Sequence, residues 1–201
     1  MDSKPTRELF ERLVCEIADH PKRRAELEDQ IKRIFSRRAA ILALDMCGFS
    51  RTTQAHGIVA FLVMIHEMQR LCEPAVRSFG GFLVKSEADN LFCLFDSPAD
   101  ALAAALDIHV RCAAANAGRS AEHALHAAIG IGFGDTLYVG KEDLHGDEMN
   151  IACKLGEDIA ELGDILLTSA AHAELPAGTV NATRHTVSIS GLALDYFRIA
   201  R

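Results

Sequence analysis

Residues 6–36 carry apolar side chains every three or four positions, for example at Phe10, Leu13 and Ile17, with charged residues between them. This spacing predicts amphipathic helices. Pro21 interrupts the pattern, so we expect two helices joined by a short turn. Such a helical hairpin either packs on its own chain or presents a face to a partner and relays a signal, and the pattern leaves both possibilities open.

From residue 37 onward, short apolar runs alternate with longer periodic stretches, which is typical of one layered domain of strands and helices. The apolar run 39–45 predicts a buried strand, and the periodic stretch after it predicts a helix that ends at about Phe79, before a Gly-Gly pair. Further strands are predicted at 82–87, 90–95, 125–133, 136–139, 165–168, 184–188 and 193–199, and further helices at 98–116 and 148–160. We therefore divide the chain into a helical extension, 1–36, and one domain, 37–201.

The leading elements follow the order strand, helix, strand, strand, helix, strand, which is the ferredoxin-like βαββαβ pattern. We expect an α+β fold with this core, extra C-terminal strands and a helix after it, and the N-terminal helices before it. In this topology the third strand lies antiparallel between the first and the second, so the carboxyl end of the first strand meets the turn that joins the other two. Asp45 ends the first strand and Asp89 lies in that turn. We therefore expect their carboxylates to lie side by side.

Two carboxylates so close require a cation, and hard oxygen ligands suit Mg²⁺ or Mn²⁺, whose other coordination positions are filled by water and substrate phosphates. After Asp45, a turn at Gly48 leads into a predicted helix, so backbone amides and the positive end of the helix would favour a polyphosphate at the same edge. The alternative is that Asp45 and Asp89 only begin a turn and a hairpin, which are ordinary roles for aspartate.

Composition narrows the classes of partner. The formal charge of −7 and the isoelectric point near 5.7 argue against a protein that neutralises a nucleic-acid backbone or an anionic membrane surface. No apolar run approaches the roughly 20 residues of a membrane-spanning helix. The N-terminal segment is charged throughout and lacks the apolar centre of a secretory signal, so we expect a cytoplasmic protein. The six cysteines are widely spaced without a CxxC pair, which favours reduced packing residues over disulfides or a zinc site.

Three segments, in this order, resemble the catalytic domains of class III nucleotide cyclases. Residues 43–50 (ALDMCGFS) are similar to the family's first metal motif, and residues 80–89 (GGFLVKSEAD) are similar to its second metal hairpin. Residues 143–155 (DLHGDEMNIACKL) resemble the segment that recognises the base and stabilises the transition state. The resemblance implies an intracellular signalling enzyme that converts a nucleoside triphosphate to its 3′,5′-cyclic monophosphate and pyrophosphate.

The resemblance implies roles for the first two motifs. Asp45, Asp89 and the backbone of Met46 would hold two Mg²⁺ or Mn²⁺ ions. One ion would prepare the ribose 3′-hydroxyl to attack the α-phosphate, and both would neutralise the triphosphate. The substrate-binding residues of the first motif would be Gly48, Phe49 and Ser50.

Lys85 and Asp143 stand at the positions that distinguish adenine from guanine in the family, where lysine with aspartate implies ATP. Lysine can donate a hydrogen bond to N1 of adenine, and aspartate can accept one from its 6-amino group, whereas guanine presents the reverse pattern at those atoms. The resemblance therefore implies an adenylate cyclase. Taken alone, a strand lysine and a loop aspartate are more often ordinary surface residues.

Asn150 and Lys154 lie four residues apart on a predicted helix and so share a face. By the resemblance, Asn150 binds the ribose region, and Lys154 stands where the family has an arginine that stabilises charge on the phosphate. Lysine keeps the positive charge but lacks the planar fork of arginine, so weaker or altered catalysis is expected. A second departure is that Ala88 and Asn90 replace the glycines usual around the second aspartate.

The resemblance also implies a homodimer with two equivalent interfacial sites. In the family, the metal residues come from one subunit and the base-reading and transition-state residues come from the other. The N-terminal helices would then be placed to alter how the two copies meet. A second interpretation is a catalytically weak or inactive cyclase-homology domain that binds nucleotide, or only a partner, as a regulatory module.

Overall fold

The computed structural model describes residues 4–48, 54, 56–189 and 192–200. In this part of the chain, eight strands form one sheet in the order β2-β3-β1-β4-β6-β8-β7, with β5 paired to β4. The strands are β1 (Ser36–Met46), β2 (Phe82–Glu87), β3 (Asn90–Phe95), β4 (Ala127–Val139), β5 (Asp143–His145), β6 (Ile165–Thr168), β7 (Ala182–Ile189) and β8 (Leu192–Ile199). The helices are α1 (Arg7–Asp19), α2 (Arg24–Phe35), α4 (Ile58–Ser78), α5 (Pro98–Asn116), α6 (Asp147–Lys154) and α7 (Ser169–Ala173), with short helical turns at Pro21–Arg23, Ala121–His123 and Leu155–Ile159.

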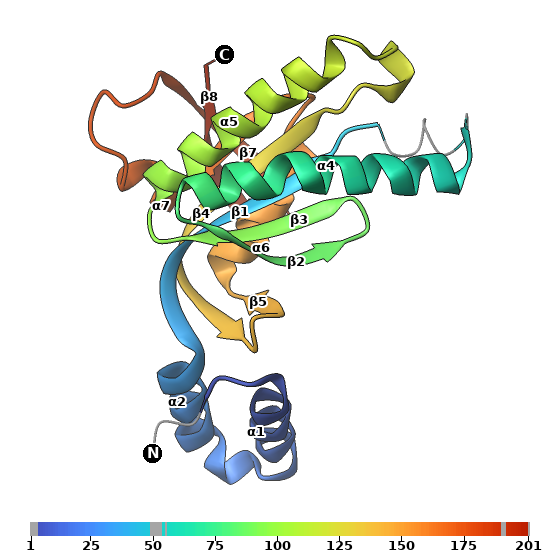
Figure 1. The fold of residues 1–201 in the computed structure, drawn as a ribbon. Helices are drawn as coiled ribbons and strands as arrows, with labels where there is room; N and C mark the ends of the chain where they lie inside the picture. The colour runs from blue at the N-terminus through green and yellow to red at the C-terminus, as the bar shows by residue number, and fades with distance from the viewer. Residues whose placement is uncertain (1–3, 49–53, 55, 190–191, 201) are drawn as a thin grey trace.

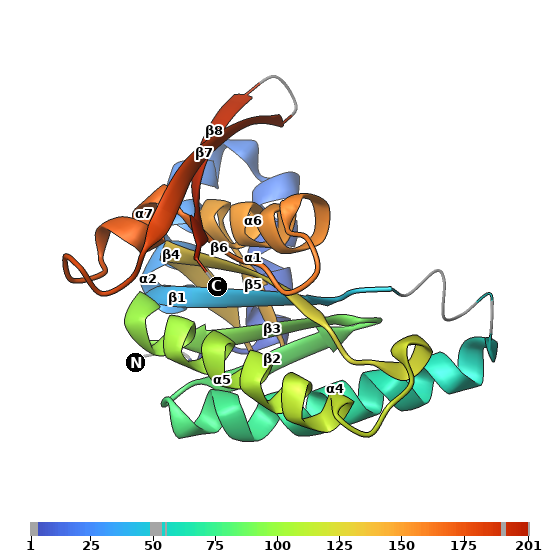
Figure 2. The ribbon, with the colours of Figure 1, turned by 90° about the horizontal axis from the view of Figure 1, so that it is seen from above.

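β1 lies inside the sheet because its side chains are apolar on both faces. Ala40 and Leu42 pack with residues of α4 and α5, while Ala39 and Ile41 pack with residues of α6. All four side chains are fully buried. Helices therefore cover the two faces of this part of the sheet, as Figures 1 and 2 show from two directions (Figure 1, Figure 2). A strand covered on both sides reads as a continuous apolar run, which is what the sequence contains.

The ferredoxin-like core predicted from the sequence is confirmed. β3 lies between β1 and β2 and is antiparallel to both. The register pairs Asp45 of β1 with Asn90 of β3, so the turn that precedes β3 lies at the end of β1. β6 continues the sheet beside β4 in parallel, and the β7–β8 hairpin extends it further.

β4 is one strand of 13 residues, so the predicted pair of strands separated at Gly134 and Asp135 is wrong. Gly134 makes room for α6, because a Cβ there would lie 2.8 Å from Cγ of Glu148. The hairpin turn comes later, at Gly140 and Lys141, whose φ angles are 61° and 65°, and β5 is the returning strand. β4 and β5 therefore project together from one end of the sheet (Figure 1).

The predicted helix 148–160 is wrong in its second half, where the structure has a π-helical turn, Leu155–Ile159. The turn brings Gly156 against the sheet. A Cβ on Gly156 would lie 3.0 Å from the carbonyl oxygen of Ala43 and 3.2 Å from the backbone nitrogen of Gly130. Close packing on β1 and β4, rather than local helix propensity, therefore sets this backbone.

α4 and α5 bury their apolar sides on the sheet, with Cys72, Cys93 and Cys112 among the packing residues. Each of the six cysteines of the chain is a free thiol. α4 has 21 residues. Neither α4 nor any other helix in the described part of the chain has the length and apolar character to cross a membrane.

α1 and α2 form a hairpin on the projecting end of β4 (Figure 1). Leu13 of α1, Phe35 of α2 and Val139 of β4 are buried in one cluster. The backbone N–H of Gly140 donates to the carbonyl oxygen of Pro5 at 2.8 Å. Of the two possibilities for the hairpin, the structure therefore shows packing on its own chain, and a relay role stays a prediction.

Candidate active site

Asp45 and Asp89 lie at one edge of the sheet, where β1 ends beside the β2–β3 turn. The backbone N–H of Met46 donates to the carbonyl oxygen of Asp89 at 3.3 Å, which joins the strand end to the turn. Burial raises the pKa of Asp45 to about 7, and the negative charges of Asp89 and Glu157 add to the shift. We call Asp45, Asp89 and Glu157 the acidic edge. It concentrates like charges in a partly buried position.

The donor set of the acidic edge fits a hard cation. Carboxylate oxygens, together with the backbone carbonyl of Met46, are ligands that Mg²⁺ and Mn²⁺ prefer. A cation would also favour the charged form of Asp45, which burial and like charges now disfavour. Among the described residues, no three or more His, Cys, Asp and Glu side chains are grouped so as to hold a metal ion by themselves. An ion at this edge would therefore complete its coordination with water or substrate phosphates.

Glu157 is an acidic residue whose place at this edge is not predicted from the sequence. It lies in the π-helical turn after α6. Burial raises the pKa of Glu157, and the charges of Asp158 and Asp89 raise it further. A regular helix from residue 148 to residue 160 would give Glu157 another direction, and no local sequence pattern marks a π-helical turn.

Gly48 follows β1 with a φ angle of 97°, in the left-handed region that favours glycine. Just before it, the backbone N–H of Cys47 donates to the carbonyl oxygen of His126 at 3.0 Å. This bond fixes the point where the chain leaves the sheet. Phe49 and Ser50, the other predicted substrate-binding residues of this motif, lie outside the described residues, as does most of the segment before α4.

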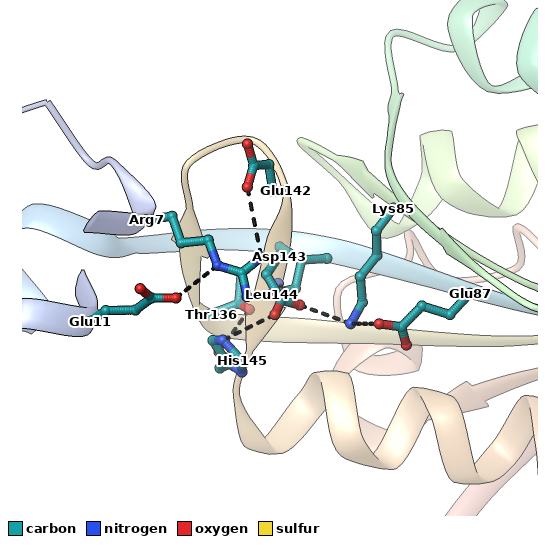
Figure 3. Close-up of polar contacts among 9 residues, drawn as sticks. All are labelled: Arg7, Glu11, Lys85, Glu87, Thr136, Glu142, Asp143, Leu144 and His145. Atoms are coloured by element: carbon teal, nitrogen blue, oxygen red, sulfur yellow. Dashed lines mark hydrogen bonds and ion pairs between the residues drawn. The ribbon is translucent and has the colours of Figure 1, made fainter. Parts of the chain in front are cut away.

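Lys85 on β2 and Asp143 at the start of β5 form an ion pair, with 2.8 Å between Nζ and Oδ1 (Figure 3). Their side chains are only 18% and 26% exposed. Lys85 also donates to Oε1 of Glu87 at 3.1 Å. Burial acts to raise the pKa of Asp143, but hydrogen bonds from Lys85 and from the Leu144 N–H outweigh it and hold this pKa below its usual value. The structure thus brings together the two residues for which the resemblance implies base recognition.

Glu87 and His145 border the Lys85–Asp143 pair, and no role is predicted for either of them from the sequence. Glu87 lies two residues after Lys85 on β2, and His145 lies two residues after Asp143 on β5. Residues two apart on a strand share a face. This period is the signal that would have placed both beside the pair.

α6 carries Asn150 and Lys154 on its exposed side. Its other side lies very close to β4, because a Cβ on Gly130 would lie only 2.0 Å from the carbonyl oxygen of Ala152. Nζ of Lys154 lies 3.7 Å from Oδ2 of Asp158. The two predicted catalytic residues therefore face solvent from a helix that is held tightly on the sheet.

The chain is similar in sequence to a cyclase relative. That protein, from Rhizobium meliloti (strain 1021), is named "Putative adenylate cyclase 3" and is 29% identical over 136 residues, which is 68% of this chain and 23% of the relative. The chain thus spans about a quarter of the relative's length. No family model matches the chain.

The structure is similar to solved cyclase structures. An adenylate/guanylate cyclase/hydrolase from Silicibacter pomeroyi is 24% identical with a TM-score of 0.69, and the match covers 83% of this chain and 98% of that one. The catalytic core of a rhodopsin-guanylyl cyclase with converted specificity, in complex with ATPαS, is 14% identical with a TM-score of 0.70 over 82% of this chain and 98% of that one. The resemblance predicted from the sequence is confirmed, and the chain has the fold of the class III adenylate/guanylate cyclase catalytic domains.

Proposed function

We propose that this domain is an adenylate cyclase, which converts ATP to 3′,5′-cyclic AMP and pyrophosphate. The observation that carries the proposal is the cyclase fold together with two charged groups in it, the acidic edge and the Lys85–Asp143 pair. These are the groups that metal-assisted phosphoryl transfer and adenine recognition require. The sequence relative named as an adenylate cyclase supports the same reaction class.

The reaction forms a bond between the ribose 3′-oxygen and the α-phosphorus, and it breaks the bond from that phosphorus to the oxygen bridging to the β-phosphate. The 3′-hydroxyl proton passes to solvent, and pyrophosphate leaves. Asp45, Asp89 and the Met46 carbonyl would hold Mg²⁺ or Mn²⁺, which would supply charge neutralisation and favour deprotonation of the 3′-hydroxyl. Asn150 orients the ribose, and the ammonium of Lys154 stabilises the negative charge that builds on the phosphate. Gly48, Phe49 and Ser50 bind the phosphate chain.

Selectivity for ATP follows from the hydrogen-bonding character of the Lys85–Asp143 pair. The ammonium of Lys85 can only donate, and the ionised carboxylate of Asp143 can only accept. Adenine offers an acceptor at N1 and donors at its 6-amino group, whereas guanine offers a donor and an acceptor at the corresponding atoms. A guanine base would therefore place a donor against the half-buried ammonium and an acceptor against the half-buried carboxylate, which costs more than a missing contact.

The active unit in this proposal is a homodimer with two sites between the copies. Each site joins the acidic edge of one copy to the Lys85–Asp143 pair, Asn150 and Lys154 of the other. An apolar stripe at the start of α4 supports a surface that another copy covers, because its large side chains are 54% to 71% exposed. The stripe consists of Ile58, Val59, Leu62 and Val63.

One observation favours a second candidate, a regulatory module that binds nucleotide without turning it over. Lys154 replaces the arginine of the family, and its ammonium lies 3.7 Å from the carboxylate of Asp158. Part of its charge is thereby balanced within the chain. A weak transition-state contact would lower turnover and leave nucleotide binding in place.

The purified protein should be incubated with ATP or GTP and Mn²⁺, and the products should be identified by chromatography and mass spectrometry. We expect 3′,5′-cyclic AMP with an equal amount of pyrophosphate, and at least about tenfold less 3′,5′-cyclic GMP. Hydrolysis to AMP, or a preference for GTP, would contradict the proposal. Tight binding of ATP with no product would instead support the regulatory module.

A further inference from the structure

The ring of His145 lies between α1 and the Lys85–Asp143 pair. On one side, its Nε2 atom is 3.5 Å from Oδ2 of Asp143 (Figure 3). On the other side, it stacks on the ring of Phe10, with 5.5 Å between ring centroids and 7° between planes. A residue of the N-terminal hairpin is thus one side chain away from the carboxylate proposed to read the base.

The backbone of His145 is fixed, which leaves its side-chain torsions as the main freedom. Its carbonyl oxygen accepts a hydrogen bond from the hydroxyl of Thr136 at 3.0 Å, and Thr136 is buried. β5 pairs with β4 through Leu137 opposite His145. The side chain itself is 48% exposed, so burial does not hold the ring. The stack on Phe10 and the contact with Asp143 therefore orient the ring.

Phe10 is in turn held by the hairpin. Its ring meets the ring of Phe35 edge-on, with 5.2 Å between centroids and 76° between planes. The start of α1 also contacts the turn between β4 and β5, where Arg7 lies 3.8 Å from the carboxylate of Glu142. The position of α1 therefore determines where the ring of Phe10 sits relative to β5.

The two oxygens of Asp143 have different partners. Oδ1 accepts hydrogen bonds from Lys85 and from the backbone N–H of Leu144, both at 2.8 Å. Oδ2 faces His145. A carboxylate oxygen has two lone pairs, so Oδ2 can meet the imidazole and still accept from the 6-amino group of adenine. The rotation of the carboxylate, and so the direction of Oδ2, depends on both partners.

We propose that His145 is a positioning residue for the Lys85–Asp143 pair and that Phe10 of α1 sets its position, so that the N-terminal hairpin controls the discrimination between adenine and guanine. The specificity half of this inference rests on the proposed function, because it requires that the pair reads a base. The positional half does not. It states that α1 fixes the Asp143 carboxylate with or without a nucleotide.

Two variants separate the contact of His145 with Asp143 from its contact with Phe10. His145→Phe keeps an aromatic ring for Phe10 and removes the nitrogen that faces Asp143. Phe10→Leu keeps an apolar side chain in the hairpin and removes the aromatic stack. His172→Phe is a matched control, because His172 stacks on Phe197 with 3.7 Å between centroids and lies in α7, on another part of the sheet.

The first measurement is hydrogen exchange of the Leu144 amide by NMR in the full chain without nucleotide. This buried amide donates to Asp143, so its exchange reports whether the carboxylate stays in place. We expect exchange about tenfold faster in both variants and unchanged in His172→Phe. Unchanged exchange in His145→Phe would overturn the inference.

The second measurement is the ratio of kcat/KM for ATP to that for GTP. We expect about a tenfold lower ratio in His145→Phe and Phe10→Leu, with kcat for ATP within about twofold of the unaltered protein. A loss of kcat with the ratio unchanged would show a structural role only and would overturn the inference. Failure of the unaltered protein to bind either nucleotide would overturn the proposed function, and the exchange measurement would still decide whether α1 positions Asp143.

Discussion

The acidic edge and the Lys85–Asp143 pair are both made by side chains far apart in the sequence, yet their electrostatics are opposite. Asp45 meets like charges and burial, and its pKa rises to about 7. Asp143 meets an ammonium, and its pKa falls below the usual value. The acidic edge thus gathers like charges that repel one another, whereas the Lys85–Asp143 pair joins opposite charges. In the proposed function, the acidic edge gains a cation, and the Lys85–Asp143 pair shares its hydrogen bonds with the base.

The two regions also differ in what positions them. The register of β1 and β3 places Asp45 beside the turn that holds Asp89, so the sheet itself sets their separation. Lys85 and Asp143 lie on β2 and β5, which belong to different hairpins. Their contact depends on side chains and on the hairpin that carries Phe10. We therefore expect the acidic edge to tolerate changes in α1 and the pair to respond to them.

The largest effect is expected from removing one charge of the acidic edge. Asp45→Asn takes away a metal ligand, and cyclic AMP formation should fall about a thousandfold or more. The control is Asp96→Asn, an exposed carboxylate that pairs with Arg37 away from this edge, with activity unchanged. The rates are compared at saturating ATP and Mn²⁺. A loss of less than about tenfold in Asp45→Asn would show that the acidic edge does not hold the metal.

The effects of pH and of added metal on the free energy of unfolding test the acidic edge in a second way. Because the folded pKa of Asp45 lies above its unfolded value of 3.8, the folded protein holds a proton that the unfolded chain has released between about pH 4 and pH 7. The metal-free protein should therefore lose stability as the pH rises through this window, and Asp45→Asn should flatten the slope. Mn²⁺ at about a hundred times its Kd should add about 2.7 kcal/mol at pH 8.

Urea unfolding curves in EDTA and in Mn²⁺, at a series of pH values, measure these effects. The Lys85–Asp143 pair should change the free energy of unfolding with pH in the opposite direction, because the pKa of Asp143 is lowered. Its contribution is present at neutral pH and is lost only as the pH falls through the folded pKa, below about pH 4. Equal stabilisation of Asp45→Asn and the unaltered protein by Mn²⁺ would place the metal elsewhere.

Selectivity is the test of the Lys85–Asp143 pair. Lys85→Ala removes the donor to N1 of adenine and leaves Asp143 without its cation, so kcat/KM for ATP should fall about 30-fold, or about 2 kcal/mol. GTP turnover should change by less than about threefold. Lys141→Ala, in the exposed turn after β4, is the matched control. An equal loss for both nucleotides would mean that Lys85 contacts phosphate or supports the fold, and that it does not read the base.

The smallest effect concerns the turn that carries Asp89. Ala88 has a φ angle of 49°, in the left-handed region where a Cβ is unfavourable. Ala88→Gly should raise the free energy of unfolding by about 1 kcal/mol. Ala103→Gly, in the interior of α5, should lower it by about as much. Chemical denaturation of both variants measures these two changes in the free energy of unfolding. Destabilisation by Ala88→Gly would show that the methyl group contributes packing that outweighs the backbone strain.

Local signals in the sequence were enough for several elements. Ser97 and Pro98 mark the start of α5, and its predicted range, 98–116, is the observed one. The strands 82–87 and 90–95 also match β2 and β3, because a tight turn separates two apolar runs. The topology of these elements then placed Asp45 near Asp89 without any knowledge of a relative.

The features that were predicted wrongly, or not predicted, depend on tertiary contacts. Gly134 is typical of a turn, yet it lies inside β4, where a Cβ would lie 2.8 Å from Cγ of Glu148 on α6. The π-helical turn that places Glu157 arises from packing against β1 and β4. The Lys85–Asp143 pair came only from the resemblance, and the contact of His145 with Phe10 joins segments that no sequence spacing relates. Contacts that depend on close packing, or that join separate hairpins, therefore could not be predicted from local sequence patterns.

Mixing two inactive variants asks whether the acidic edge of one copy acts with the face of α6 of another copy across a dimer. Asp45→Asn damages the acidic edge, and Asn150→Ala damages the face of α6. Random exchange between the two variants gives heterodimers in half of the molecules, each with one intact site, so the mixture should regain about a quarter of the unaltered activity. Activity in the mixture no higher than in either variant alone, with dimers formed, would contradict a site shared between two copies.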